Sequence, residues 1–314
     1  MSARGPDPER AALDARVVQW MSEADWIDDD VRFDALALEL FAFQVARCAP
    51  FARFCAGRGA TPATVKSWRD IPAVPTGAFK ELALRSFPAE REVHVFRTSG
   101  TATDGRGALH LDTLALYERS LLPSFRLHVV PDLDELGGRI PIRVLAPPPD
   151  EAPDSSLTHM FECAIRALGS PASGFDVRRG EIDLDGLLHA LRRAARGQTP
   201  LALCGTAFAF VHLLDALAAR GERIALPRAA RVMETGGFKG RARTLSRDAL
   251  YAGIADRLGV PSERIVNQYG MTELGSQFYD SVLRRRDEPR RKLAPPWTRV
   301  RIVDPRTGRD AERG

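Results

Sequence analysis

The sequence is poor in the residues that most catalytic and metal-binding motifs need. Only four of its 45 basic residues are lysines, and its 314 residues include four cysteines and six histidines. The cysteines form no C-x-x-C pair and no Cys/His grouping of the zinc-binding kind, which fits a reducing cytoplasm. The histidines accompany neither a G-x-S-x-G serine nor an H-E-x-x-H pair, so the sequence predicts neither that class of hydrolase nor that class of zinc peptidase.

Long apolar runs and a one-sided charge distribution are also missing. No uninterrupted apolar run is long enough to span a bilayer, and residues 1–18 lack the apolar core of a secretory signal. We therefore expect a cytoplasmic protein without a membrane span. The net charge is +4, but basic residues cluster only at 284–286 and 290–292. Such short clusters are more typical of a solvated loop than of a nucleic-acid surface, so no nucleic-acid partner is expected.

The apolar content of 44% and the length allow a large buried core. Residues 1–60 have the spacing of helices, and we expect them to pack as a helical segment on a main domain of residues 61–314. From residue 90 onward a β-rich run, a glycine-bearing loop and, in most cases, a helical pattern recur. The β-rich runs are residues 92–96, 200–204, 230–235 and 263–268. This alternation predicts an α/β fold, with a mainly parallel sheet flanked by helices and the glycine loops on one rim. We interpret the proline-rich residues 145–156 as a surface loop.

The first glycine loop, "RTSGTATDGRG" at residues 97–107, combines hydroxyls, glycines and a cation behind a β-rich run. This composition favours a phosphate-binding loop. Gly100 and Gly105 have the spacing of a P-loop, but Arg106 and Gly107 stand where that motif needs lysine and a hydroxyl residue. The P-loop interpretation is therefore disfavoured, while a plain hairpin turn rich in Ser, Thr and Gly stays open.

A second loop, "QYGMTELGSQ" at residues 268–277, places Tyr269, Thr272 and Glu273 around Gly270. Together with T-S-G-T, this loop resembles the adenylate-forming superfamily. In that superfamily a carboxylate attacks the α-phosphorus of ATP, so two anions meet and their charge must be neutralised. The resemblance implies ATP and Mg²⁺ as cofactors.

Further motifs narrow the resemblance to the acyl-protein synthetase family of the LuxE type, the long-chain-fatty-acid–protein ligases of bacterial bioluminescence. The matching stretches are "IPAVPTGAFKE" (71–81), "RTSGT" (97–101), "GRGALHLD" (105–112), "CGTAFAFVHLLD" (204–215), "METGGFKGR" (233–241), "NQYGMTELGSQFYD" (267–280) and "APPWTRVRIVDPRTG" (294–308). The resemblance implies that a fatty acid and ATP give an acyl-adenylate, whose acyl group passes to a protein thiol. It also implies an acyl reductase as partner, and the large N-terminal domain of the adenylate-forming fold.

The resemblance assigns a role to individual residues. Catalytic roles fall to Thr272, Glu273 and Arg106, with Glu273 also holding the metal. Lys239 is expected to contact a phosphate or the substrate carboxylate, and the alternative is a surface residue at the start of a helix. The nucleotide would contact Thr98, Ser99, Gly100, Thr101, Thr103, Gly236, Gly237, Tyr269 and Gly270. The acyl substrate would lie against Gly205, Thr206 and Phe208.

The sequence departs from the family pattern in two places. Ala102, Thr103 and Arg106 replace the usual Thr, Gly and Lys of the phosphate loop. We also find no match to the Y-x-T-G-D stretch, the C-terminal lid or the acyl-accepting cysteine, so the lid is expected to be largely absent and Cys204 is the one thiol worth testing. A carboxylate–CoA ligase of the phenylacetate type and a non-catalytic binding subunit are the alternatives.

Overall fold

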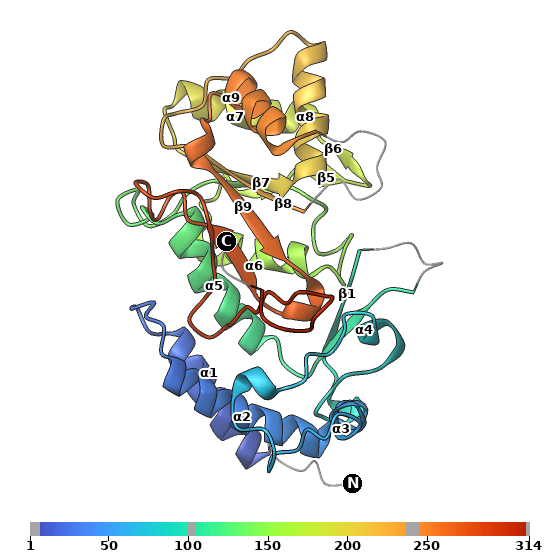
Figure 1. The fold of residues 1–314 in the computed structure, drawn as a ribbon. Coiled ribbons are helices and arrows are strands. Elements are labelled where there is room, and N and C mark those ends of the chain that lie inside the picture. The colour runs from blue at the N-terminus through green and yellow to red at the C-terminus, as the bar shows by residue number, and fades with distance from the viewer. Residues whose placement is uncertain (1–6, 100–104, 237–244, 312–314) are drawn as a thin grey trace.

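The computed structural model describes residues 7–99, 105–236 and 245–311, and its centre is a seven-stranded sheet of order β11-β10-β9-β8-β7-β3-β4 (Figure 1). Strands β4, β3, β7, β8 and β9 run parallel, and β10 and β11 are antiparallel additions at one edge. The strands are β3 (Ile142–Leu145), β4 (Gly174–Phe175), β7 (Ala202–Thr206), β8 (Arg231–Thr235), β9 (Ile265–Gly270), β10 (Gln277–Asp280) and β11 (Lys292–Leu293). The predicted α/β fold with a mainly parallel sheet is confirmed.

Helices cover both faces of the sheet, because successive side chains of a strand point to opposite faces. Cys204, Met233 and Val266 belong to the core shared with helices α5 (Ala115–Val129) and α6 (Ser156–Leu168). Their chain neighbours Leu203, Val232 and Ile265 belong to a second core, shared with α7 (Leu184–Arg196), α8 (Ala207–Ala219) and α9 (Arg247–Leu258). Figure 1 shows the two helical layers on either side of the strands.

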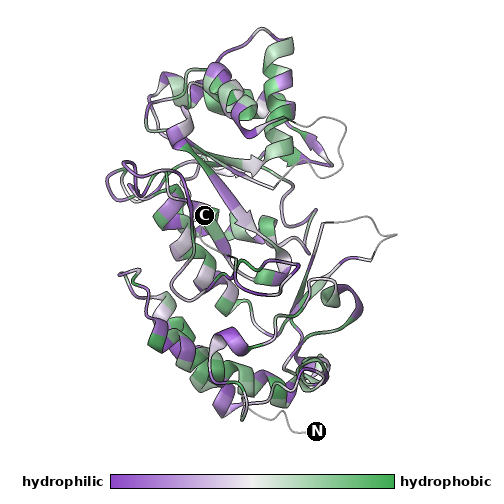
Figure 2. Cartoon of the chain, in the orientation of Figure 1, coloured by the Kyte–Doolittle hydropathy of each residue, from purple (hydrophilic) through white to green (hydrophobic). Residues whose placement is uncertain are grey.

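The N-terminal region is helical, with α1 (Pro8–Met21), α2 (Asp30–Arg47) and α3 (Ala49–Ala56). The Asp29 carboxylate caps α2 by accepting a hydrogen bond from the backbone N–H of Arg32 at 2.9 Å. Hydrophobic and hydrophilic residues alternate along these helices in Figure 2, and Leu13 and Trp20 of α1 form a small buried core with Leu36 and Phe43 of α2. The small core of Phe41 and Phe51 continues to Val65, across the expected boundary at residue 60. We retain the division at residue 60 as a proposal.

Strands β1 (His94–Arg97) and β2 (Ala108–Leu111) form a separate antiparallel pair, and this pairing differs from the sequence-based prediction. Residues 92–96 were expected to supply a strand of the main sheet. The segment that follows β1 explains the difference. A parallel crossover needs about a dozen or more residues, whereas the ten residues 98–107 return directly to an antiparallel partner. The first glycine loop therefore connects the two strands of a hairpin and does not follow a strand of the parallel sheet.

The sheet also contains a strand that the pattern did not reveal. Strand β3 lies between β7 and β4. It is only four residues long, and Ala146 and three prolines follow it directly. The remaining short elements are α4 (Ala78–Glu81), β5 (Val177–Arg178), β6 (Glu181–Ile182) and 3₁₀ turns at Trp68–Asp70, Ala89–Arg91, Ser262–Arg264 and Thr272–Leu274.

Among the described residues, none of the helices is by itself both long and apolar enough to cross a membrane. Helices α2 and α3 reach that length and composition only when taken together, and the chain bends by 109° between them.

Candidate active site

Three neighbouring parallel strands end along one edge of the sheet. Thr206 of β7 pairs with Thr235 of β8, which pairs in turn with Gln268 of β9. The Thr235 hydroxyl donates a hydrogen bond to the Gln268 carbonyl oxygen at 3.1 Å. This carboxyl edge is where open α/β sheets bind ligands, and it carries two of the three predicted nucleotide loops.

The third loop, residues 98–107, is closed at its base by hydrogen bonds. The Thr98 hydroxyl accepts from the backbone N–H of Gly107 at 2.9 Å, and the Thr98 N–H donates to the Gly107 carbonyl at the same distance. The Arg106 Nε donates to the Thr98 carbonyl at 2.7 Å. The side chain of Thr98 thus holds both ends of the loop together. Ser99 is exposed directly beyond this ring.

Arg106 also ties the loop to a distant part of the chain. Its guanidinium forms an ion pair with Asp154 at 2.7 Å, and the backbone N–H of Arg97 donates to the Asp154 carbonyl at 2.8 Å. Asp154 belongs to residues 145–156, which sequence analysis interpreted only as a surface loop. The structure therefore shows Arg106 as a clamp, and its contact with a phosphate stays a prediction.

Glu273 brings the two family motifs into contact. It lies in the 3₁₀ turn that Thr272 opens and that Gly275 ends with a left-handed φ of 62°. A Cβ placed on Gly107 would lie 3.2 Å from Glu273 Oε1 and 3.1 Å from Thr98 Cγ2. The phosphate loop and the Y-G-M-T-E loop therefore meet at a position where only glycine fits without displacement. Sequence analysis assigned no role to Gly107, because only the fold brings it to Glu273.

The Glu273 carboxylate and the Thr98 hydroxyl form a set of hard oxygen donors. Within the described part of the chain, no group donates a hydrogen bond to Glu273 or pairs with its charge. Magnesium usually binds one or two carboxylates together with substrate phosphates. The residues present thus fit a magnesium ion that a nucleotide would bring.

Tyr269 offers a flat aromatic surface at the same edge. Its side chain is half exposed, and its ring stacks on that of Phe278 with centroids 6.1 Å apart and planes at 11°. The two residues are direct partners in the pairing of β9 with β10. Adenine could stack on the outer face of Tyr269, which suits the role implied for this residue.

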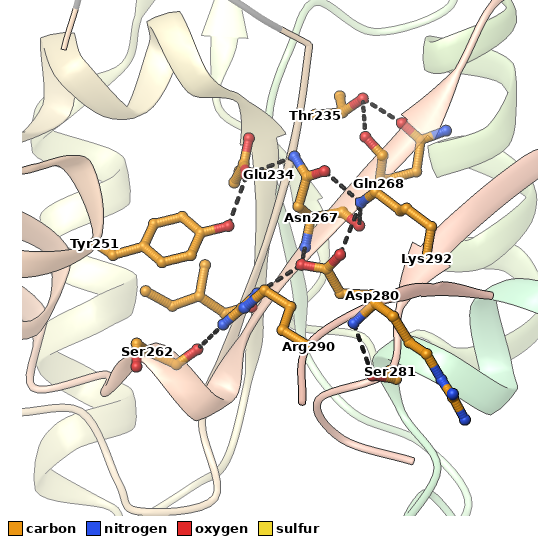
Figure 3. Close-up of polar contacts among 12 residues, drawn as sticks. Glu234, Thr235, Tyr251, Ser262, Asn267, Gln268, Asp280, Ser281, Arg290 and Lys292 are labelled. Carbon is orange, nitrogen blue, oxygen red and sulfur yellow. Dashed lines mark hydrogen bonds and ion pairs between the residues drawn. The ribbon is translucent and has the colours of Figure 1, made fainter. Parts of the chain in front are cut away.

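Behind this edge lies a buried polar network, drawn in Figure 3. Glu234 accepts hydrogen bonds from the Tyr251 hydroxyl at 2.9 Å and from the Asn267 side-chain amide at 2.6 Å. Burial raises the pKa of Glu234, an effect that these hydrogen bonds oppose. The network joins the ends of β8 and β9, and its Asn267 lies two residues before Tyr269 on β9.

Asp280 extends the network to the sheet edge (Figure 3). It accepts hydrogen bonds from the Asn267 backbone at 3.2 Å and from Arg290 at 2.5 Å, and pairs with Lys292 at 2.9 Å. The Lys292 ammonium also donates to the Asn267 carbonyl at 2.5 Å. Burial lowers the pKa of Lys292, opposed by Asp280. These contacts fix β9, β10 and β11 against one another and so orient the Tyr269–Glu273 segment.

Gly236 follows β8 with φ of 78°, a conformation that favours glycine, and its Cβ direction is open among the described residues. Its predicted role beside the nucleotide therefore has a conformational basis. Five other predicted site residues lie outside the described residues, namely Gly100, Thr101, Thr103, Gly237 and Lys239.

The three residues assigned to the acyl substrate have identifiable local contacts. A Cβ on Gly205 would lie 2.7 Å from Leu145 Cβ, so glycine permits β3 and β7 to pack closely. The Thr206 hydroxyl caps α8 by accepting from the Ala209 N–H at 3.1 Å. The Phe208 ring packs edge-on against His212, with centroids 4.3 Å apart. Their contact with an acyl chain stays a prediction.

Cys204 is fully buried in β7, and burial raises the pKa of its thiol. A nucleophilic cysteine must be accessible and ionised. Cys204 is therefore not the acceptor that the sequence left open. The other three cysteines are buried as well.

Two grooves lie away from this edge. One, of about 620 Å³, lies between α1, α2 and residues 86–91, and the other, of about 340 Å³, lies along Glu92–Val95 and Asp154. Neither is lined by Tyr269 or Glu273.

Comparison with known proteins agrees with the motifs. The family model described as acyl-protein synthetase, LuxE, matches residues 9–314. The chain therefore belongs to the LuxE acyl-protein synthetase family. Among proteins with a curated description, none matches.

Solved structures that match include 2-hydroxyisobutyryl-CoA ligase, in an open conformation with 2-HIB-AMP and CoA. That structure is 15% identical in sequence, with a TM-score of 0.49 and a match over 77% of this chain. The chain spans about half the length of that ligase, at 54%.

Proposed function

We propose that this protein is an adenylate-forming ligase that activates a long-chain fatty acid with ATP and passes the acyl group to a protein thiol. Membership of the LuxE family supports this class of reaction. The single observation that carries the proposal is the meeting of Glu273 with Thr98 and Gly107, where a Gly107 Cβ would lie 3.2 Å from the carboxylate. This contact joins the two loops that would hold the phosphates.

In the first half-reaction, the fatty-acid carboxylate attacks the α-phosphorus of ATP, a P–O bond forms and pyrophosphate leaves. The ends of the Thr98 loop and the Glu273 turn would bind the triphosphate, and the exposed face of Tyr269 would bind adenine. A magnesium ion at Glu273 would supply positive charge where two anions approach. Hydrogen-bond donors that are already in place would stabilise the developing charge without reorganisation.

In the second half-reaction, a thiolate attacks the acyl carbonyl and AMP leaves. All four cysteines of the sequence are buried, so the acceptor is a thiol other than these. An acyl reductase that takes the acyl group is the partner that the family suggests. A location in the cytoplasm would supply ATP and keep such thiols reduced.

Hydroxylamine trapping tests the proposal. Acyl-adenylates react with hydroxylamine to give hydroxamates, so the protein with ATP, Mg²⁺ and a panel of fatty acids should form long-chain hydroxamates. CoA and a thiol-bearing acyl reductase are then supplied as alternative acceptors. Acyl transfer to the reductase supports the proposal, and transfer to CoA alone would make the protein a carboxylate–CoA ligase. Absence of any hydroxamate would contradict an enzymatic role and favour a binding subunit.

A further inference from the structure

A cluster of metal-ligating side chains lies between α5 and α6, outside the candidate active site. Glu118 of α5 faces His159 and Cys163 of α6, which are one helical turn apart on the same face. His159 Nε2 lies 3.1 Å from Glu118 Oε1, and Cys163 Sγ lies 3.5 Å from the same oxygen. All three ligand atoms lie within 4.8 Å of one another.

We propose that Glu118, His159 and Cys163 bind a zinc ion, with His94 as the fourth ligand. Zinc bonds of about 2.3 Å to sulfur and about 2.0–2.1 Å to nitrogen and oxygen place tetrahedral O and S ligands about 3.5 Å apart and O and N ligands about 3.3 Å apart. The observed separations of 3.5 and 3.1 Å are close to these values. A thiolate and imidazoles select zinc over magnesium or calcium, which prefer oxygen.

His94 offers an unpartnered ring nitrogen beside the cluster. Its Nε2 is buried and has no hydrogen-bond partner among the residues the structure describes. A neutral imidazole nitrogen is the group by which histidine binds a metal ion. The ring centroids of His94 and His159 are 6.2 Å apart, against roughly 5 Å for two imidazoles on one zinc. A shift of about 1 Å would complete the site.

Arg166 contacts two of the proposed ligands. It donates to Glu118 Oε2 at 3.2 Å and to Cys163 Sγ at 3.5 Å, and Glu118 Oε1 is turned toward His159 and Cys163. The Cys163 thiol donates a hydrogen bond to Glu118 at 3.5 Å, and a bound metal ion would displace its proton. Glu118 keeps about a quarter of its side chain exposed, at 28%, which gives an ion a path to the buried sulfur.

The proposed site would fasten the strand that leads into the phosphate loop. His94 opens β1, and Thr98 follows the last residue of that strand. A zinc ion would join β1 to α5 and α6, so it would have a structural role distinct from the magnesium proposed at Glu273. The proposal does not depend on the ligase activity.

The test compares zinc binding by the full chain with binding by matched variants. The protein is stripped with chelator, reloaded with Zn²⁺, and measured for metal content and thermal unfolding, and cobalt is used as a spectroscopic probe. We expect one zinc per chain, a rise in Tm of roughly 5 °C at a hundredfold excess over Kd, and a thiolate-to-cobalt charge-transfer band.

Cys163→Ser and Glu118→Gln should each lose zinc and the Tm rise, and Cys163→Ser should also lose the charge-transfer band. His94→Ala should lower the zinc affinity at least tenfold. Cys55→Ser, which alters an equally buried cysteine on α3, should bind zinc as the wild type does. Glu118→Gln keeps the shape of the side chain, so it reports on binding even where Cys163→Ser unfolds. Failure of the wild type to bind zinc, or equal binding by Glu118→Gln, would overturn the proposal.

Discussion

Gly107 is the residue where the two proposed nucleotide loops approach each other, and its replacement tests the importance of that approach. In Gly107→Ala the new methyl group would lie 3.1 Å from Thr98 Cγ2 and 3.2 Å from Glu273 Oε1. The neighbours must move by a few tenths of an ångström, so we expect adenylate formation to fall roughly tenfold or more, because misplacement at a reacting centre is costly. The free energy of unfolding should change by less than about 1 kcal/mol.

The control for Gly107 is Gly77→Ala, because a Cβ at Gly77 meets no described atom within 4 Å. This variant should adenylate at the wild-type rate. Equal rates for Gly107→Ala and Gly77→Ala would show that the contact with Glu273 has no catalytic consequence.

His128 makes stability depend on pH. It is buried, its Nδ1–H donates a hydrogen bond to the Ser124 carbonyl at 2.8 Å, and its ring stacks on Tyr279. Burial lowers the pKa of His128 to about 4, the Ser124 carbonyl opposes this, and Arg284 and Arg285 add to it. The unfolded chain therefore binds this proton near pH 6.5, and the folded chain only near pH 4.

The stability that neutral His128 provides is complete above pH 6.5 and is lost as the pH falls toward 4. The shift corresponds to about 3 kcal/mol. Urea unfolding of the wild type and of His128→Phe should thus give a difference that changes by about that amount between pH 7 and pH 4. A difference that stays constant over this range would contradict the buried neutral imidazole.

At the scale of elements, the β1–β2 hairpin is held by the ion pair of Arg106 and Asp154. Both side chains are about one-third exposed, at 31% and 34%, so the pair itself should contribute at most about 1 kcal/mol. Arg106→Gln and Asp154→Asn both remove the pair. If Arg106 also binds a phosphate, the adenylation rate of Arg106→Gln should lie roughly tenfold or more below that of Asp154→Asn, and its KM for ATP should be raised. Equal losses in the two variants would show that Arg106 is a clamp alone.

Lys292 and Asp280 hold strands β9, β10 and β11 together at the sheet edge. Lys292→Met leaves Asp280 with Arg290 and leaves the Asn267 carbonyl without its ammonium donor. We expect a loss of about 1–3 kcal/mol in the free energy of unfolding. A smaller drop in kcat should follow, because Tyr269 loses its support. Denaturant unfolding measures the first effect, with Arg286→Gln on the exposed surface as a control. Unchanged stability of Lys292→Met would mean that the network does not support the edge.

At the scale of the whole molecule, the sequence predicted the fold through local patterns. Strands β7, β8 and β9 and helices α8 and α9 follow from periodicity and from caps such as Ser246, which accepts the Ala249 N–H at 3.2 Å. The pairing of β1 and the position of β3 were missed, because pairing depends on partners distant in the chain. The contact of Arg106 with Asp154 and that of Glu118 with Cys163 span 48 and 45 residues and leave no local signal.

The motifs also carried most of the candidate site. Tyr269 and Glu273 were assigned because their spacing is typical of the family, and the fold places Glu273 and Thr98 on either side of Gly107. Gly107 and the network of Glu234, Asn267 and Asp280 were not found. Their residue types are common, and only the packing of β8, β9 and β10 gives them a role.

We propose that the Glu273 turn and the Thr98 loop form a magnesium-dependent adenylation site. ATP–pyrophosphate exchange measures this step directly. We expect exchange that depends on a fatty acid and is abolished by a chelator. Glu273→Gln should lower the exchange rate roughly a hundredfold or more, which corresponds to a few kcal/mol of transition-state stabilisation. The exposed control Glu263→Gln should exchange at the wild-type rate. Exchange at the wild-type rate in folded Glu273→Gln, or no exchange with any fatty acid in the wild type, would contradict the claim.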